Sequence, residues 1–262
     1  MKKNHLLLTM LIACVTTASA QTKDDVYYKA NDVSFAMVYV EGGSFMMGAP
    51  ADDTECDENC RPAHKVTLSS YYICKYEVSQ RLWEAVMGSN PSSYKSEMPD
   101  NIYIDVPVHD VSWFDCQEFI SKLNKLTGKQ FRLPTEAEWE FAARGGKKSK
   151  GYMYSGSNRL GAVAWADKET PAYIGPSRER WGNELGIYDM TGNVDEWCQD
   201  WYGPYKKTAQ VNPKGPQTGT SRVLRGGSYF GINKSWKVWE RMKDTPYYSA
   251  DRLGLRLVIS AK

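Results

Sequence analysis

Histidine is scarce in this sequence: three residues among 262, at positions 5, 64 and 109. A serine hydrolase needs a histidine and an acid beside an activated serine, and no G-x-S-x-G segment is present to carry one. A zinc site at Cys56 and Cys60 would need two further ligands, and beyond the N-terminal segment only two histidines remain. We therefore expect neither a hydrolase nor a zinc centre, and expect His64 and His109 to be structural hydrogen-bonding residues.

The sequence also lacks an excess of charge of one sign. There are 33 lysines and arginines against 31 aspartates and glutamates. A nucleic-acid partner would need a concentrated basic face, so we expect no binding of nucleic acid. No run of about 20 apolar residues, the length that spans a bilayer as a helix, occurs in the chain. No transmembrane segment is expected.

The N-terminus reads as a secretory signal peptide over residues 1–20. Two lysines precede a short apolar run at residues 6–15, and Ala18-Ser19-Ala20 supplies an A-x-A cleavage site. We therefore expect an exported protein, periplasmic or extracellular. Leu11-Ile12-Ala13-Cys14 also resembles a lipoprotein signal, which gives an outer-membrane lipoprotein, lipid-anchored at Cys14, as the alternative.

Five cysteines follow the signal segment, an odd number for a protein that export would place where disulfides form. At least one is therefore unpaired or joined to another chain. A local bridge between Cys56 and Cys60 is sterically allowed, and the pairing stays open. The apolar surroundings of Cys74, Cys116 and Cys198 favour buried small residues over nucleophiles.

Long regular elements are also few, because 21 glycines and 12 prolines interrupt the chain. Residues 21–35 read as a polar lead-in and residues 36–262 as one domain. Capping boxes predict two helices, one after Ser112 that stops at Gly128 and one from Thr135 to Arg144. Alternation and flanking turns predict short strands over residues 38–40, 44–48, 65–68, 71–78, 222–225 and 252–258.

Seven segments occur in an order that resembles a known family. They are MVYVEGGSFMMG (37–48), YEVSQRLWEAVMG (76–88), PVHDVSWFDCQEF (107–119), FRLPTEAEWEFAARGG (131–146), NELGIYDMTGNVDEWCQDWY (183–202), RVLRGGSY (222–229) and LGLRLV (253–258). Over about residues 36–260 the chain is thus similar to formylglycine-generating enzyme, or sulfatase-modifying factor. The resemblance implies an α+β fold class: one compact, C-type lectin-like domain with little regular secondary structure.

Enzymes of this family oxidise a cysteine of a client sulfatase to formylglycine with molecular oxygen. They hold Cu(I) between two thiolates, spaced C-x4-C after a Gly-Gly-Ser turn, because soft sulfur selects this ion. The resemblance maps these thiolates onto Gly231 and Trp236, which cannot bind copper. Ser228 matches a serine of the catalytic pocket, although a role in the turn is favoured here. We expect a vestigial pocket at Ser228, Gly231 and Trp236, without copper; whether the chain is an enzyme stays open.

The resemblance also implies one structural Ca²⁺ ion in the segment DMTGNVDEW. Its ligands would be the side chains of Asp189 and Glu196 and the carbonyls of Gly192 and Val194. Oxygen atoms gathered by a Gly-Asn bend suit a hard cation, although the same residues could merely stabilise a turn. Asp195 replaces the family's usual tryptophan, which we expect to alter packing. The second calcium loop aligns with residues 162–165, which offer little coordination, so one ion is expected.

Two functions remain from this reading. The first is an exported, non-catalytic module for binding or envelope assembly, with a protein or peptide, or a glycan, as partner. The alternative is a protein-modifying oxidase of the formylglycine-generating type, acting on a sulfatase cysteine through a non-standard site to which folding brings Cys198. The intact turn and the missing thiolates favour the binding module.

Overall fold

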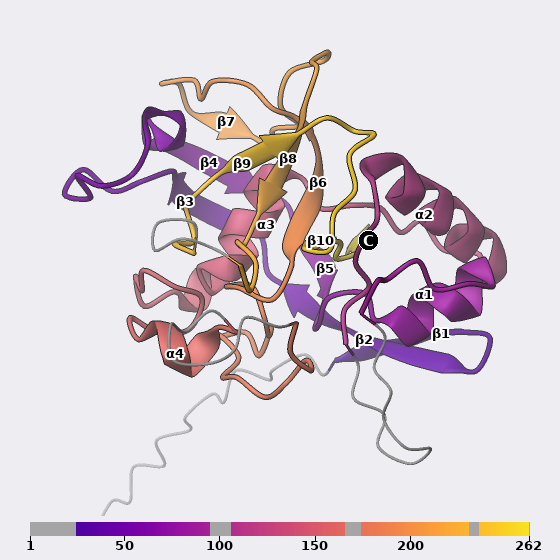
Figure 1. Cartoon of the computed structure of the whole chain (residues 1–262). Helices are drawn as coiled ribbons and strands as arrows, with labels where there is room; N and C mark the ends of the chain where they lie inside the picture. The colour runs from indigo at the N-terminus through magenta and orange to yellow at the C-terminus, as the bar shows by residue number, and fades with distance from the viewer. Residues whose placement is uncertain (1–24, 95–105, 166–173, 231–235, 262) are drawn as a thin grey trace, which may run out of the picture.

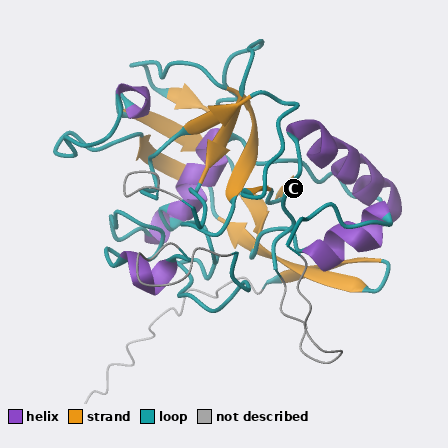
Figure 2. Ribbon diagram, in the orientation of Figure 1, coloured by secondary structure: helices purple, strands orange, loops and turns teal. Residues whose placement is uncertain are grey.

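The computed structural model describes residues 25–94, 106–165, 174–230 and 236–261. The predicted signal peptide, Cys14 and Gly231 lie outside these residues. The described chain forms three small sheets and four α-helices, joined by long loops (Figure 2). The predicted fold class, an α+β domain with little regular secondary structure, is confirmed.

The first sheet is antiparallel, with strand order β1–β2–β5–β11. Its strands are β1 (Val26–Ala30), β2 (Val33–Val40), β5 (Tyr71–Cys74) and β11 (Val258–Ser260). Helices α1 (Gln80–Met87) and α2 (Trp113–Thr127) pack on one face of it, at the right of Figure 1. Leu82 of α1, Phe119 of α2 and Met37 of β2 share the apolar core of this half.

The second and third sheets enclose a buried helix, α3 (Glu136–Ala143). The second has the order β10–β6–β8–β9 and the third β3–β4–β7. Their strands are β10 (Leu253–Gly254), β6 (Asp195–Trp201), β8 (Arg222–Arg225), β9 (Met242–Asp244), β3 (Gly43–Met47), β4 (His64–Leu68) and β7 (Gln210–Val211). Figure 1 shows α3 running through the middle of the molecule. The short α4 (Leu160–Val163) lies at the periphery.

The domain begins about ten residues earlier than the sequence predicted. Residues 21–35 were expected to be a polar lead-in, but β1 and the start of β2 form a hairpin within them. The ring of Tyr28 stacks on Phe35 and meets Phe131 edge-on, with 5.1 Å between the latter ring centroids. Aromatic pairs of this kind stabilise neighbouring strands, so the polar composition of residues 21–35 as a whole did not exclude a strand.

Both predicted helices are confirmed by their caps. The side chains of Ser112 and Thr135 accept hydrogen bonds from the amides of Asp115 and Glu138, and each box is closed reciprocally. Helix α1 was not predicted, although Ser79 caps its start and Gly88, with φ 84°, ends it. With eight residues, it is too short to be predicted from the periodicity of its hydrophobic residues.

The predicted strand over residues 252–258 is divided into β10 and β11, because Arg256 turns inward between them. Its guanidinium is fully buried and donates to the carboxylate of Glu196 and to the carbonyls of Cys74 and Tyr188. A buried guanidinium needs hydrogen-bond acceptors on all sides. The backbone at Arg256 leaves the strand to reach these acceptors, which interrupts strand pairing from the end of β10 to the start of β11. The strand predicted over residues 71–78 likewise ends at Cys74.

Every residue of α3 is buried, including its three glutamates. Each glutamate meets an arginine: Glu136 binds Arg241 with two N–O distances of 2.5 and 2.7 Å, Glu138 binds Arg132, and Glu140 binds Arg144 and Arg225. The capping box explains Glu138 as predicted, but Glu136 also serves as a buried counter-ion. Helix α3 is therefore held by charge pairs as well as by apolar contacts.

The antiparallel pairing of β6 with β8 determines which residues lie at each end of this ladder. Glu196 of β6 pairs with Arg225 of β8, and Trp201 pairs with Arg222. The chain therefore reaches Ser228 at the end of the ladder where β6 begins, whereas Trp201 lies at the other end. Among the described helices, none is both long enough and apolar enough to cross a membrane.

Candidate functional site: the Ser228 turn and the calcium loop

The Gly-Gly-Ser turn after β8 keeps a constrained backbone. Gly226 and Gly227 have φ values of 97° and 72°, a region that favours glycine. A Cβ atom on Gly226 would lie 3.2 Å from the ring of Trp139, so the turn also sits tightly on α3. The carbonyl of Gly226 accepts a hydrogen bond from the amide of Gly192, which links the turn to the predicted calcium loop. Ser228 is thereby buried at a defined position.

Trp236, one of the two residues at the family's thiolate positions, is packed into the protein. Its indole N–H donates to the carbonyl of Ser228 over 2.9 Å, and the side chain is 3% exposed. It packs on Ala164, with Tyr154 and Leu160 nearby. The turn and Trp236 are thus in contact, and the indole fills space beside the serine.

Asp195 is a residue of this site that sequence reasoning had assigned only to packing. Its side chain is 2% exposed and interacts with the side chain of Ser228, while Arg252 Nε lies 3.6 Å from Oδ2. The other oxygen, Oδ1, is buried with no hydrogen-bond partner among the described residues. Burial raises the pKa of Asp195 to about 7. The replacement of the family's tryptophan therefore adds a polar group at Ser228.

The thiols of the described residues that the sequence predicted to be buried are poorly disposed to ionise. Cys198 is fully buried in the apolar cluster around α3, and burial raises its pKa well above the ordinary value. Burial likewise raises the pKa of Cys74 to about 12 and that of Cys116 well above its usual range. All five cysteines of the described chain are free thiols. Since the thiolate is the form that binds metal, Cys198 is poorly suited to the role that the alternative hypothesis gives it.

The two histidines of the described chain have structural partners, as predicted. The ring of His64 contacts the carbonyl of Pro62 through Nδ1 at 3.1 Å. His109 contacts the carbonyl of Pro107 through Nδ1, and its Nε2 accepts from the amide of Tyr94. Both rings are buried.

The predicted calcium loop curls through three residues with left-handed backbone. Asp189, Gly192 and Asn193 have φ values of 57°, 82° and 66°. Asp189 is buried; its Oδ2 accepts from the amide of Arg178 at 3.4 Å, whereas Oδ1 has no hydrogen-bond partner among the described residues. The carboxylate of Glu196 accepts hydrogen bonds from Arg256 and from the indole of Trp139. These bonds fix its orientation and already occupy both of its oxygens.

Glu77 is a third acid at this loop, and the sequence gave no signal for it. Its carboxylate accepts from Asn193 Nδ2 at 2.7 Å and from the amide of Val194 at 3.2 Å. Burial, and then the charge of Asp189, raises the pKa of Glu77 well above its usual range, while burial raises that of Asp189 to about 7. Three buried acids, Glu77, Asp189 and Glu196, thus lie near the guanidinium of Arg256, and Arg180 adds a further positive charge near Asp189.

This loop fits a bound cation on the chemistry of its donors. An orphaned buried carboxylate oxygen and a local excess of acids would both be satisfied by a positive ion. Nowhere in the described ranges do three His, Cys, Asp or Glu side chains cluster as a metal site. The predicted ligand set requires only two carboxylates, with main-chain carbonyls as the others.

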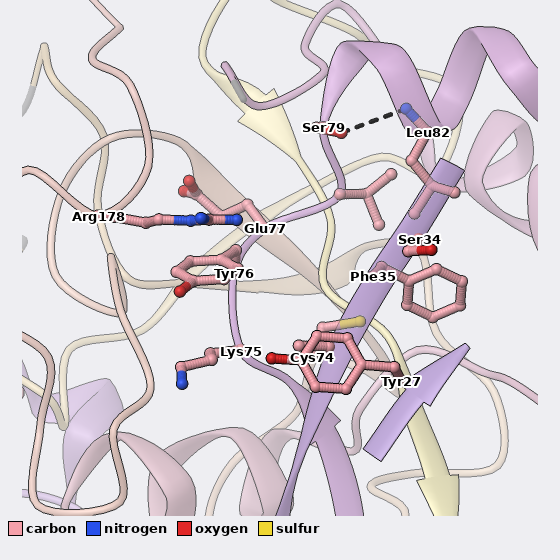
Figure 3. Close-up of a pocket in the computed structure, with 12 residues that line it drawn as sticks. Tyr27, Ser34, Phe35, Cys74, Lys75, Tyr76, Glu77, Ser79, Leu82 and Arg178 are labelled. Atoms are coloured by element: carbon pink, nitrogen blue, oxygen red, sulfur yellow. Dashed lines mark hydrogen bonds between the residues drawn. The ribbon is translucent and has the colours of Figure 1, made fainter. Parts of the chain in front are cut away.

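A small cavity of about 170 Å³ is lined in part by Glu77. Figure 3 shows Arg178 lying over the ring of Tyr76, with 4.5 Å between the guanidinium carbon and the ring centroid. Cys74 and Lys75 also line the cavity, and Lys75 is paired with Asp25 over 2.6 Å. The cavity gives solvent-sized molecules a place beside the loop.

Comparison with known proteins finds one family and several individual proteins to which this chain is similar. A family model for the sulfatase-modifying factor enzyme 1-like domain matches residues 24–261. Chaperone protein LppX of Paenibacillus barcinonensis is 33% identical, over 84% of this chain and 83% of its own. The formylglycine-generating enzyme of Thermomonospora curvata is 28% identical, over 86% and 93% of the two chains. The solved structure of Treponema denticola variable protein 1 superposes with a TM-score of 0.81 at 30% identity, covering 92% of this chain and 100% of that one.

Proposed function

The chain belongs to the sulfatase-modifying factor enzyme 1-like domain family, and from this we propose that it is a member that binds a partner instead of oxidising a thiol. In this proposal the protein is exported and acts as a binding or assembly module of the cell envelope. Its partner is a protein or peptide, or a glycan, that reaches the surface around Ser228.

The observation that carries the proposal is the buried indole of Trp236. A residue that cannot bind Cu(I) stands where the family has a thiolate, and it is hydrogen-bonded to the carbonyl of Ser228 itself. Gly231, at the other thiolate position, has no donor side chain. Cys198, the thiol that the alternative requires, is buried in the core and so is poorly placed to serve as a soft ligand.

The groups at the turn support recognition by hydrogen bonding. Asp195 supplies a carboxylate with one unpartnered oxygen, and Arg252 supplies a positive charge beside it. Such buried polar groups bind a partner that completes their hydrogen bonds and reject one that does not. The protein similar to this chain that is named a chaperone, LppX, is consistent with a protein as the partner.

A structural calcium ion is the second part of the proposal. Asp189 and Glu196 would hold it with their carboxylates, and Gly192 and Val194 with their carbonyls. When bound, the ion would supply positive charge that offsets the buried acids. Because the amide of Gly192 is bonded to Gly226, an ordered loop would also keep the Ser228 turn in place.

The proposal is tested by Cu(I) binding and by aldehyde formation in parallel. Purified protein is titrated with Cu(I) against a chromogenic chelator, and is incubated with copper, oxygen and a peptide carrying Cys-x-Pro-x-Arg, followed by mass spectrometry. We expect no tight Cu(I) binding and no aldehyde. The double variant G231C/W236C should gain Cu(I) binding, because it restores the two thiolates.

The Thermomonospora curvata enzyme serves as the positive control for the peptide assay. Aldehyde formed by the unmodified protein would overturn the proposal, and its loss in C198A would favour the alternative oxidase. Aldehyde formation that persists in C198A would point to another site.

A further inference from the structure

A separate cavity lies at the opposite end of β6 from Ser228. Its volume is about 330 Å³, and it opens between the start of α3 and the loop of residues 203–216. Trp201, which lines it, pairs with Arg222, whereas the Ser228 turn follows Arg225. The two sites thus occupy the two ends of one strand ladder.

The walls of this cavity are mainly aromatic and proline rings, with Met47, Lys206 and Gln210 among them. Tyr205 lies against His64, with 4.8 Å between ring centroids, and Trp201 forms the adjoining wall. The loop closes over them because two glycines allow close approach: a Cβ on Gly203 would lie 2.6 Å from Pro216, and one on Gly215 3.0 Å from Asp200. Rigid apolar walls of this kind are typical of pockets for small organic groups.

The floor carries Asp200 and an ion pair that is already complete. Glu136 is bonded twice to Arg241 and once to the hydroxyl of Tyr205, so its charge is neutralised. Asp200 is 4% exposed, and its Oδ2 accepts from the amide of Glu136 at 3.1 Å. Asp200 forms no ion pair with any side chain of the described residues.

We propose that this cavity binds an organic ammonium group, such as the side chain of a lysine in a peptide, with Asp200 as its counter-ion and the aromatic walls around its apolar stem. A buried carboxylate without a cationic partner is best satisfied by a charged N–H donor. The volume is ample for one arylalkyl or alkyl chain. This site is independent of the partner proposed for Ser228.

The charges around Asp200 predict how such binding depends on pH. The acids around it are Glu136 and Glu138 of α3. The cations are Arg132 before α3, Lys206 of the cavity loop, Arg222 of β8 and Arg241 before β9. His64 of β4, the phenol of Tyr205 and the thiol of Cys198 complete the titratable groups around it. Burial, and next the charge of Glu136, raises the pKa of Asp200 to about 8. Binding of an ammonium ion should therefore release a proton from Asp200 to solvent below this pH, and affinity should rise as the pH approaches 8.

The test compares 2-phenylethylamine with its neutral analogue 2-phenylethanol by calorimetry and by NMR of the indole N–H signals. In the unmodified protein at pH 8.5 we expect the amine to bind at least tenfold more tightly than the alcohol, and to shift an indole signal that W201F removes. In D200N this preference should be lost, because the amide carries no charge. E84Q, which removes a charge from an exposed position on α1, should keep it.

Equal binding of amine and alcohol, an unchanged preference in D200N, or no binding of the amine at millimolar concentration would each overturn the proposal. If D200N does not fold, the unmodified protein decides the question by itself. Amine affinity must then rise between pH 6 and 8 while that of the alcohol stays constant, and a flat profile for the amine would contradict the role of Asp200. Neither result bears on the copper experiment at Ser228.

Discussion

Replacing Asp200 by asparagine should change the pH dependence of folding in a defined direction. In the folded protein the pKa of this carboxyl is about 8, compared with 3.8 for an ordinary aspartate. Between pH 3.8 and about pH 8, the carboxyl of Asp200 is therefore ionised in the unfolded chain but protonated in the folded protein. The contribution of Asp200 to stability is therefore complete below pH 4, falls as the pH rises, and is lost above about pH 8.

The size of the effect follows from the same two values. A pKa difference from 3.8 to about 8 corresponds to a loss of up to about 6 kcal/mol across this range. Other groups titrate as well; the pKa of Glu136 is lowered by Arg241 and Arg225 against the effect of burial. The difference between variant and parent isolates Asp200, because asparagine resembles the protonated acid and can still accept the amide of Glu136.

Urea unfolding at several values between pH 4 and pH 9 provides the measurement. D200N should match the parent near pH 4 and become more stable than it by several kcal/mol at pH 9. E84Q should follow the parent throughout. A stability difference that does not change with pH, or a D200N protein that is less stable than the parent at pH 9, would refute the reasoning, because Asp200 would then be stabilised in its charged form.

Two further predictions concern the other buried charges. Calcium at about 100 times its dissociation constant should stabilise the protein by about 2.7 kcal/mol, which raises the melting temperature by roughly 5–10 °C relative to the protein in chelator. The D189N variant should lose this shift. A shift in D189N equal to that of the parent would show that Asp189 is not a ligand. R225M should lower the free energy of unfolding by about 3–5 kcal/mol, because it leaves Glu140 buried beside one fewer cation. Adding E140Q to R225M should recover part of the loss, and a simple sum of the two single effects in urea unfolding would contradict the coupling.

Helices α2 and α3, whose starts depend on residues close together in the sequence, were predicted correctly. Ser112 and Thr135 placed two helices correctly because a capping box depends on residues three positions apart. Strand β6 was not predicted because its sequence, DEWCQDW, carries three acids and a glutamine, yet all seven of its residues are buried or half-buried by segments from elsewhere in the chain. Its Glu196 is neutralised by Arg256, 60 positions along the chain.

The candidate site was predictable only where the family motif reached it. Asp189, Ser228 and Trp236 were found from their places in the motifs, and the structure brings the last two into contact. Glu77 could not be found in this way, because it reaches the loop through Asn193, 116 positions away. The cavity at Asp200 was also missed, since its walls come from five separate segments and carry no shared motif.

The pairing of buried charges suggests where this chain keeps the capacity to bind. Arg225, Arg241 and Arg256 are each matched by a glutamate of α3 or β6, so these acids serve the fold. Glu77, Asp189 and Asp200 are buried acids for which nearby arginine charges only partly offset burial, so that the pKa of each is raised. Leaving such groups unpaired is costly, and a ligand that carries positive charge offsets the cost. On this argument we propose that the predicted calcium loop and the cavity at Asp200 bind two different cations, one inorganic and one organic.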